Sequence, residues 1–438
     1  MDAGTVTFYK NGISQGVAYS GLSGYFSPSI GDGGQSTAAS GSANFGQKPF
    51  KFPPPAGFQP LALANTPRPT IVRPDQYVGI VTYTGTGATR SLNVGFKPDF
   101  VWIKERGATG GPVIVDSVRG SSATLQTHAT TQEQIDGDAV TGFNPYGLSL
   151  GSGYTVVSVN GSTRTYVGWA WKAGGNSNTY NINDIGYSTA SAAGLTAGTK
   201  TPTGASVNTK SGFSIIAFTG DETAGTISHG LGKAPSFYIV KTRDSNSGGS
   251  NDWYCYHSAL GASARIQLNS TDAQTTGSSQ WNSTSPTSSV LSLGSGSWQE
   301  TGDRFIIYAW AEIPGFSKFG SYTGNYNADG PFVHTGFRPR WVMIKCSSTS
   351  GFDWRIFDTS RSDANGANPV NYKLYPNLNA RENDPSYDNA SSNNIDILSS
   401  GFKLRTNNGA TNDPNTYIYA AFAETPSFNL YGGQSNAR

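Results

Sequence analysis

The chain repeats one pattern of turns and strands three times, and this repetition limits its possible folds more than any other feature. In each copy a turn containing Gly and Pro leads into a short strand that ends in Lys. These strands occupy residues 100–104 (FVWIK), 237–241 (FYIVK) and 341–345 (WVMIK). An aromatic-Thr-Gly triplet precedes each turn, and a second strand follows the Lys. Because order and approximate spacing recur, we expect each copy to form a unit of the same fold.

The aromatic residues that recur in the copies are expected in the core. Side chains alternate between the two faces of a strand, and both faces of residues 100–104 are largely apolar, which is typical of a strand inside a sandwich. A closing strand in each copy carries Ala followed by Trp or Phe. The recurrent aromatic residues predicted in the core are Phe100, Phe237, Trp341, Trp171, Trp310, Phe422, Trp253 and Trp354.

Composition indicates an all-β protein with many turns. Charged residues make up 13% of the chain, against the ~25% of an ordinary soluble domain, and 55 of the 438 residues are Gly. Gly, Ser, Thr and Asn fill the gaps between short aromatic and β-branched runs, and no stretch sustains the 3.6-residue periodicity of an amphipathic helix. We therefore expect tandem β-sandwich domains, jelly-roll-like, with few helices.

The spacing of the Lys-ending strands sets the expected domain boundaries. Lys104 and Lys241 are 137 residues apart, whereas Lys241 and Lys345 are 104 apart, and the surplus of 33 matches a stretch rich in Gly, Asn, Ser and Thr. We expect repeat A to pivot on this arm, and repeats B and C to form a stiff pair. The predicted divisions are a partial β-sandwich (1–62), a Pro-rich linker (63–78), repeat A (79–173), the arm (174–211), repeat B (212–316), repeat C (317–428) and a tail (429–438).

The N-terminal unit is predicted to begin with a hairpin. Residues 5–10 are expected to form a strand, Asn11-Gly12 a tight turn, and residues 16–19 the return strand. Further on, Tyr25-Phe26-Ser27-Pro28 and Asn44-Phe45-Gly46 follow in order. This succession resembles the C-terminal half of a SPRY (B30.2-like) β-sandwich. A complete sandwich needs roughly twice this length, so we expect a fragment of a longer protein; the alternative is that another chain supplies the missing strands.

The sequence argues against several classes of function. The net charge of +2 without a basic block disfavours a nucleic-acid partner. The chain has no run of ~18 apolar residues that could insert into a membrane, and residues 1–20 lack the pattern of a signal peptide. Neither the four histidines nor Cys255 and Cys346 have metal-binding spacing, so we expect no metal and no cofactor.

Acidic residues that recur are expected to be structural rather than catalytic. Asp116 and Arg119 share their spacing with Asp358 and Arg361, which suits an ion pair at the end of a strand. Repeat B has His257 and Leu260 at these positions, so the fold does not require the pair. No nucleophile motif stands at a strand end. We therefore name no catalytic residue and do not expect an enzyme. The recurrent acids are Asp116, Asp358, Glu312 and Glu424.

Aromatic residues without a counterpart in every repeat are the candidates for ligand binding. They mostly lie in stretches rich in Ser, Thr, Asn, Asp and Gln, and sugar sites combine exposed rings with such polar groups. The alternative is that each ring folds back over its own domain. The candidate residues are Trp281, Trp298, Tyr326, Tyr372, Tyr375 and Tyr387.

The repeat resembles tandem β-domains in structural proteins of tailed phages, particularly marine phages. The shared features are the Gly-Phe-x-Pro turn with its Lys-ending strand, the Trp-x-x-x-Asp strand, the Ala-(Trp/Phe)-Ala-Glu exit and residues 178–187 of the arm. Repeat A departs from them at Pro112 and at Lys172-Ala173. The resemblance implies a virion component of the tail or surface, made in the host cytoplasm, commonly trimeric and in contact with other virion proteins.

From this resemblance and the loop aromatics we expect a tail-fibre-like protein that attaches to a host surface polysaccharide or receptor. A first alternative is a purely architectural capsid-decoration protein or baseplate spacer. A second is a glycan-degrading enzyme of the tailspike type, which would need a pair of Asp or Glu residues in a cleft.

Overall fold

The computed structural model divides into two compact units, Met1–Arg68 and Pro69–Arg438. Each unit is described by itself. The residues that the structure describes are 4–22, 42–44, 48–56, 58, 69–152, 156–244, 251–277, 279–361, 368–387, 394–407 and 409–426.

The first unit contains an antiparallel hairpin of β1 (Val6–Lys10) and β2 (Ile13–Tyr19). Asn11 and Gly12 form its turn with φ values of 52° and 81°, the positive φ that a tight two-residue hairpin turn requires. The predicted hairpin is therefore confirmed. Residues 25–30 and 45–47, where the sequence predicts further SPRY-like strands, lie outside the described residues.

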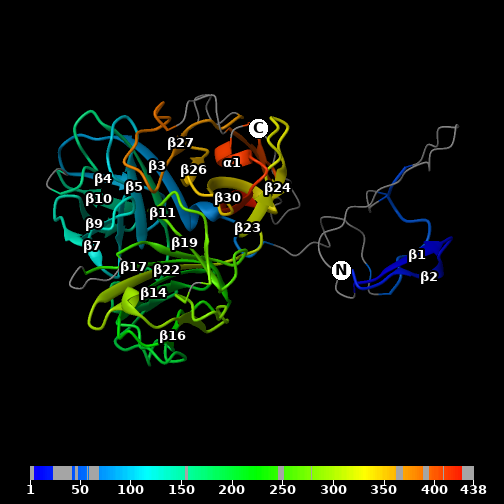
Figure 1. The fold of residues 1–438 in the computed structure, drawn as a ribbon, viewed down its shortest axis with the longest axis horizontal. Coiled ribbons are helices and arrows are strands. Elements are labelled where there is room, and N and C mark those ends of the chain that lie inside the picture. The colour runs from blue at the N-terminus through cyan, green and yellow to red at the C-terminus, as the bar shows by residue number, and fades with distance from the viewer. Residues whose placement is uncertain are drawn as a thin grey trace. The chain divides into compact units, whose positions relative to one another are not determined.

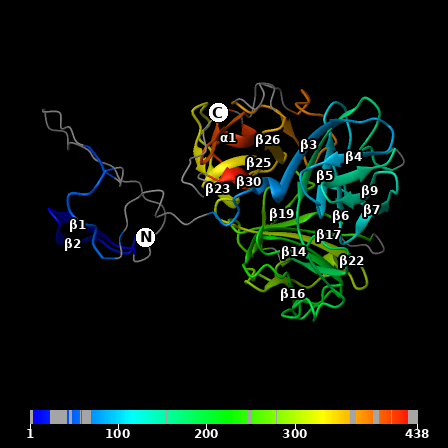
Figure 2. The ribbon, with the colours of Figure 1, turned by 180° about the vertical axis from the view of Figure 1, so that it is seen from behind.

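The second unit holds the three repeats, and each repeat pairs a large sheet with a small one (Figures 1 and 2). In repeat A, η2 (Pro74–Gln76) precedes the first strand. Its large sheet has the spatial order β3 (Val78–Thr84), β11 (Thr165–Trp171), β5 (Phe100–Glu105), β6 (Val113–Asp116), β7 (Gly120–Gln126) and β8 (Gln134–Ile135). Its small sheet has the order β4 (Arg90–Asn93), β10 (Gly147–Leu150) and β9 (Val140–Asn144).

Repeat B extends its large sheet with strands from the arm. The spatial order is β13 (Ile185–Tyr187), β12 (Tyr180–Ile182), β14 (Gly204–Asn208), β15 (Phe213–Thr219), β22 (Arg304–Ala311), β17 (Pro235–Thr242), β18 (Tyr254–His257), β19 (Ala264–Gln267) and β20 (Thr275–Thr276). The small sheet pairs β16 (Gly225–Ser228) with β21 (Val290–Leu293), and η3 (Ser297–Gln299) precedes the closing strand.

Repeat C follows the same plan. Its large sheet has the order β23 (Ser317–Thr323), β30 (Thr416–Pro426), β25 (Phe337–Cys346), β26 (Arg355–Asp358) and β27 (Lys373–Leu374). Its small sheet has the order β24 (Phe332–His334), β29 (Gly401–Leu404) and β28 (Ile395–Leu398), and α1 (Gly409–Asn412) precedes the closing strand.

The spatial order is therefore the same in all three large sheets: first strand, closing strand, Lys-ending strand, and then the two strands that follow it. The prediction of an all-β protein built from β-sandwich units is confirmed. The repeated sequence pattern corresponds to a repeated strand order, because equivalent residues occupy equivalent strands.

The large sheets of the three repeats share one hydrophobic core. Along β5, Val101 and Ile103 belong to the apolar cluster inside repeat A. Phe100 and Trp102, on the opposite face of the same strand, belong to a cluster that includes residues of repeats B and C. Each large sheet is thus covered by its own small sheet on one face and by the other repeats on the other. In Figure 1 the repeats lie side by side, blue to cyan for A, green for B and yellow to red for C.

Aromatic rings from all three repeats meet at the centre of this core. The ring of Trp171 lies edge-on to Trp310 of repeat B at 6.3 Å, and to Trp341 and Phe422 of repeat C at 5.5 Å each. A cavity of about 10 Å³ remains between them, which is close to the smallest volume that holds a water molecule. The eight recurrent aromatic residues are all buried, so their predicted place in the core is confirmed.

The expectation that repeat A pivots on the arm is wrong. Strand β12 of the arm pairs in parallel with β14, and β14 pairs with β15 of repeat B. The buried carboxylate of Asp99 in repeat A accepts hydrogen bonds from the backbone N–H of Ala173 at 2.8 Å and from the Ser206 hydroxyl of the arm at 3.0 Å. The arm is therefore part of the sheet structure, and repeat A is fixed by the shared core.

Replacing Trp171 with Ala is expected to destabilise all three repeats together. Removing a buried Trp costs about 3–5 kcal/mol, and its ring contacts all belong to the shared core. Chemical denaturation followed by tryptophan fluorescence and circular dichroism should show one transition, shifted to lower denaturant. The matched control is Tyr146→Ala, since Tyr146 is 69% exposed. A variant in which repeat A unfolds separately from unchanged B and C would contradict a shared core.

Candidate functional site

Two of the aromatic residues predicted to bind ligand lie inside repeat B. Trp281 is fully buried, donates its indole N–H to the carbonyl oxygen of Ala264 at 3.0 Å, and packs edge-on against Tyr238 at 4.8 Å. Trp298 is 7% exposed and lies 6.1 Å from Trp281. The structure corrects the prediction for these residues, because rings packed between the two sheets of the repeat have no face free for a sugar.

The remaining candidates belong to repeat C and differ in exposure. Tyr375 is buried at 1% exposure, so the prediction is corrected for it as well, whereas Tyr372 is half-buried. Tyr387 is 47% exposed and Tyr326 is 59% exposed. The sequence pattern did not distinguish exposed from buried tyrosines, because both kinds have similar polar neighbours in the chain.

Tyr387 lies over the buried Tyr375, with the ring centroids 6.0 Å apart and the planes at 47°. The guanidinium of Arg355 lies 5.7 Å from the Tyr375 ring. The three side chains thus form a stack that ends in an exposed ring, and we call it the Tyr387 stack. A buried base of this kind holds the outer ring at low cost in side-chain entropy.

The loop that carries Tyr387 is anchored at several points. The backbone N–H of Glu382 donates to the carbonyl of Arg106 in repeat A at 2.9 Å. Asn383 binds the backbone of Lys373 through its side chain, and Tyr387 N–H donates to the carbonyl of Asp384 at 3.0 Å. The exposed ring is therefore carried by a described segment, residues 382–387, whose backbone is held by hydrogen bonds.

Tyr326 is presented by a second loop of repeat C. Its backbone has a φ of 53° and its N–H donates to the carbonyl of Asn412. The amide side chain of Asn412 donates to the carbonyl oxygens of Asn327 at 2.8 Å and Thr406 at 2.6 Å. This buried asparagine holds the loop in place beneath an exposed aromatic ring.

The recurrent acids are held in ion pairs. Asp116 binds Arg119 and Asp358 binds Arg361, each at 2.5 Å with all four side chains fully buried. The predicted Asp-x-x-Arg ion pair is therefore confirmed. The other two recurrent acids also have basic partners, Lys318 for Glu312 and Arg338 for Glu424.

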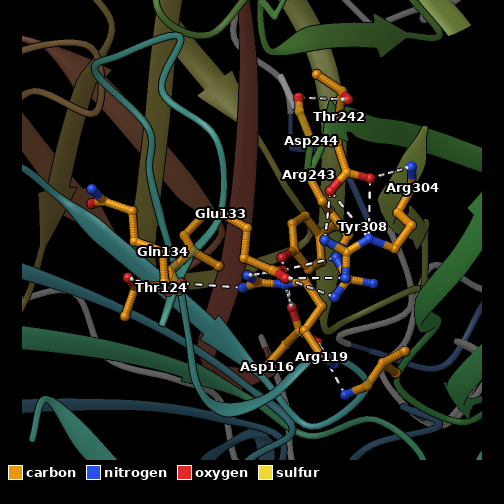
Figure 3. Close-up of polar contacts among 12 residues, drawn as sticks. Asp116, Arg119, Thr124, Glu133, Gln134, Thr242, Arg243, Asp244, Arg304 and Tyr308 are labelled. Atoms are coloured by element: carbon orange, nitrogen blue, oxygen red, sulfur yellow. Dashed lines mark hydrogen bonds and ion pairs between the residues drawn. The ribbon is translucent and has the colours of Figure 1, made fainter. Parts of the chain in front are cut away.

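The Asp116–Arg119 pair belongs to a network that joins repeats A and B (Figure 3). Arg119 also contacts Glu133 at 3.2 Å, and Glu133 binds Arg243 of repeat B through both of its carboxylate oxygens at 2.8 Å. The hydroxyl of Tyr308 in repeat B donates to Asp116 at 2.7 Å. The two arginines hold the pKa of Glu133 below its usual value even though burial opposes this.

An equivalent network joins repeats C and A. Arg361 binds Glu382 at 2.6 Å, and Glu382 binds Arg106 of repeat A at 2.7 Å. The indole N–H of Trp169 in repeat A donates to Asp358 at 2.9 Å. Trp169 occupies the position in its closing strand that Tyr308 occupies in repeat B. The two contacts between repeats are therefore built alike.

The contact between repeats B and C keeps the backbone geometry but lacks these ions. The N–H of Gln274 donates to the carbonyl of Ser347 at 2.9 Å, as Glu133 does to Arg243 and Glu382 to Arg106. At the positions of the acid and the two arginines stand Gln274, Leu260 and Ser347. The strand aspartate is replaced by His257, whose Nε2 lies 3.1 Å from the carbonyl oxygen of Tyr419.

The lysines that end the repeated strands are buried at the same contacts. Lys241 donates to the carbonyl of Thr130 in repeat A at 3.3 Å, and Lys345 to that of Thr271 in repeat B at 2.9 Å. Lys104 donates to Gly110, whose own N–H donates to Asn379 of repeat C. Burial lowers the pKa of Lys104 to about 7 and the pKa values of Lys241 and Lys345 to about 8.

Fold and contacts together define a protein of three like β-sandwiches closed around a common core. The chain belongs to the family described as a domain of unknown function (DUF7483), whose model matches residues 73–426. No curated protein and no solved structure gives a significant match to the chain.

The described residues contain no group of three or more His, Cys, Asp and Glu side chains placed to hold a metal ion. Over the same part of the chain, no helix has the length and apolar character needed to cross a bilayer. Cys255 and Cys346 are buried and free.

Replacing Arg361 with Leu is expected to lower the free energy of unfolding by about 3–5 kcal/mol, because it leaves Asp358 buried without its cation. Urea denaturation measures the change. The matched control is Arg381→Leu, since the Arg381 side chain is 50% exposed and an exposed pair contributes ~1 kcal/mol or less. Equal effects of the two substitutions would show that the buried network does not hold repeats C and A together.

Stability is expected to rise between pH 7.5 and 9. In this range the unfolded lysines, with pKa 10.5, hold protons that Lys104, Lys241 and Lys345 release in the folded state, so stability increases with pH. Above pH 9 the raised pKa of Cys255 opposes this rise, and above pH 10 the raised pKa of Tyr308 opposes it further. Urea denaturation across this range measures it, and Lys345→Met should reduce the slope. A flat or falling profile from pH 7.5 to 9 would contradict the expectation.

Proposed function

We propose that this protein is a non-enzymatic virion component, tail-fibre-like, that contributes to attachment to a glycan on the host surface. The observation that carries the proposal is the Tyr387 stack, an exposed ring held over a buried one on an anchored loop. Such a ring can lie under the apolar face of a sugar, while neighbouring amides and charged groups bind its hydroxyls. Arg381 and Asp384 on the same loop supply polar groups of this kind.

The shared core supports the structural half of the proposal. Three sandwiches with common aromatic packing and buried ion networks form a stiff block, as an attachment protein under mechanical load requires. The resemblance to phage tandem domains adds the virion location, the host cytoplasm as the place of synthesis, contacts with other virion proteins and a homotrimeric assembly. The same stiffness favours the architectural alternative, a capsid-decoration protein or baseplate spacer, and immunogold labelling of virions distinguishes the two by location.

A glycan-degrading role receives less support from the geometry. Glycosidases use two carboxyl groups about 5–10 Å apart across the substrate. The four recurrent acids are instead each bound to a Lys or Arg side chain. Measuring the viscosity of a polysaccharide incubated with the protein tests this alternative directly.

Tyr387→Ala is expected to weaken glycan binding by about tenfold, since roughly 1.4 kcal/mol corresponds to a factor of ten and one ring–sugar contact is of this order. A glycan array identifies the ligand, and isothermal titration measures the affinity. Tyr387→Phe should retain binding, because the ring remains.

The matched control is Tyr146→Ala, which removes an exposed tyrosine from repeat A. Tyr326→Ala tests whether the second loop of repeat C takes part. If the wild-type protein retains no glycan, or if Tyr387→Ala binds as tightly as the wild type, the attachment role is wrong.

A further inference from the structure

The contact between repeats B and C contains a buried histidine where the other two contacts have an aspartate. His257 is 1% exposed, and its ring lies 5.9 Å from that of Phe237. It stands at the end of β18, the position that Asp116 occupies on β6 and Asp358 on β26. The side chain therefore lies at a boundary between repeats and away from solvent.

Both ring nitrogens of His257 form hydrogen bonds, one as a donor and the other as an acceptor. Nε2 lies 3.1 Å from the carbonyl oxygen of Tyr419 in repeat C and must carry a hydrogen to bind it. Nδ1 accepts a hydrogen bond from the backbone N–H of Ala259 at 3.2 Å. Only the neutral ring protonated at Nε2 satisfies both bonds.

Protonation of the ring would place a hydrogen on Nδ1, where it faces the N–H of Ala259. Two donors then oppose each other in a buried site, and among the described residues no carboxylate is bound to the ring to balance the new positive charge. At the equivalent place in the other contacts, the buried acid is bound to an arginine. Leu260 occupies that arginine position in repeat B, so the part of this contact that the structure describes lacks the equivalent ion pair.

We propose that the contact between repeats B and C is an acid-sensitive switch, in which protonation of His257 separates β18 from β30 while the other two contacts stay closed. The device is built into one of three otherwise equivalent contacts. It would let repeat C, which carries the Tyr387 stack, change its position relative to repeat B when the surroundings become acidic.

Burial has the largest effect on the charge state of His257. Burial lowers the pKa of His257 to about 4, and the bond to Tyr419 offsets this in part. On the described strands β17, β18, β19, β23 and β30, the one carboxyl side chain is Glu424, which is bound to Arg338. The titratable and charged side chains on these strands are Tyr238 and Lys241 on β17, Tyr254, Cys255 and Tyr256 on β18, Arg265 on β19, Lys318 and Tyr322 on β23, and Tyr417, Tyr419 and Glu424 on β30.

The direction of the effect follows from these pKa values. An exposed histidine has a pKa of 6.5, so between pH 6.5 and about 4 the open contact binds a proton that the closed contact does not. Acid therefore favours opening, and the effect grows as the pH falls through this range. In the A–B contact the arginines lower the pKa of Glu133 from its ordinary value of 4.5, so acid weakens that ion pair only as the pH falls to about 4.5 and below.

Hydrogen exchange followed by mass spectrometry on the full chain tests the proposal. Protection factors, which correct for the intrinsic pH dependence of exchange, are compared at pH 7.5 and 4.5. We expect protection of β18 to fall by tenfold or more at pH 4.5, and that of β6 and β26 to change much less. Equal changes at the three contacts, or none, would overturn the switch.

The variant His257→Gln removes the titration but keeps an amide N–H that can donate to Tyr419. It should lose the acid response at β18. The matched control is His229→Gln, because His229 is bound in the same way, with Nε2 3.2 Å from the carbonyl of Thr287 and Nδ1 accepting from Leu231 N–H, but within repeat B. Burial also lowers the pKa of His229 to about 4. This variant should keep the response, and a response that follows His229 would refute the role of His257.

A measurement on the wild-type protein keeps the test valid if His257→Gln fails to fold. With four histidines in the chain, ¹⁵N-labelled histidine gives resolvable ring signals by NMR. The His257 ring should be neutral with hydrogen on Nε2 at pH 7.5, and it should become charged at the pH where β18 loses protection. Opening with a neutral ring, or charging without opening, would each overturn the proposal.

Discussion

Burial of both faces of three β-sheets is the constraint on which the rest of this structure depends. An ordinary sandwich buries one face of each sheet and leaves the other to solvent. Here the outer face of every large sheet carries aromatic residues such as Trp102, Phe237 and Trp341. These faces can leave water only by packing against one another. Three sandwiches therefore close around a common centre.

Closing the three sandwiches around one core also buries polar groups at its edges. The residues that bind these groups differ between the three boundaries. Strand ends that enter the centre bring backbone carbonyls and side-chain charges with them, and each must find a partner away from water. Buried lysines bind the carbonyls, and Asp–Arg–Glu–Arg networks neutralise the charges at two boundaries. At the third boundary, between repeats B and C, neutral side chains stand at the positions of these charged residues, among them Leu260 and Gln274. The three boundaries therefore join different side chains, although their backbone contacts are alike.

The sequence predicted the parts of this fold that depend on local pattern. Repeated strands, recurrent core aromatics, the Asn11-Gly12 turn and the Asp-x-x-Arg pair each rest on residues close together in the chain. Glu133 was missed, because its partner Arg243 lies 110 residues away and nothing local marks it as a contact. The fusion of the repeats was missed for a similar reason. The apolar character of both faces of residues 100–104 was visible, but it was assigned to the interior of a single sandwich.

The candidate site was predicted less well than the fold. Trp281 has polar neighbours in the sequence, yet its ring is inside repeat B because the carbonyl of Ala264 satisfies its N–H. Tyr375 and Tyr387 have similar flanks and opposite exposure, since one forms the base of a stack and the other its top. Exposure of a loop aromatic depends on how the loop folds back, and periodicity does not report this.

Covalent linkage of the repeats has a consequence for how such an assembly can change. In a ring of three identical chains, any substitution at the interface appears three times, so every contact changes at once. In a single chain that encodes three copies, one boundary can be altered while its two counterparts keep the ring together. His257, Leu260, Gln274 and Ser347 together form such an alteration. In the proposed switch, this break in symmetry gives one molecule two contacts that stay closed in acid and one that opens.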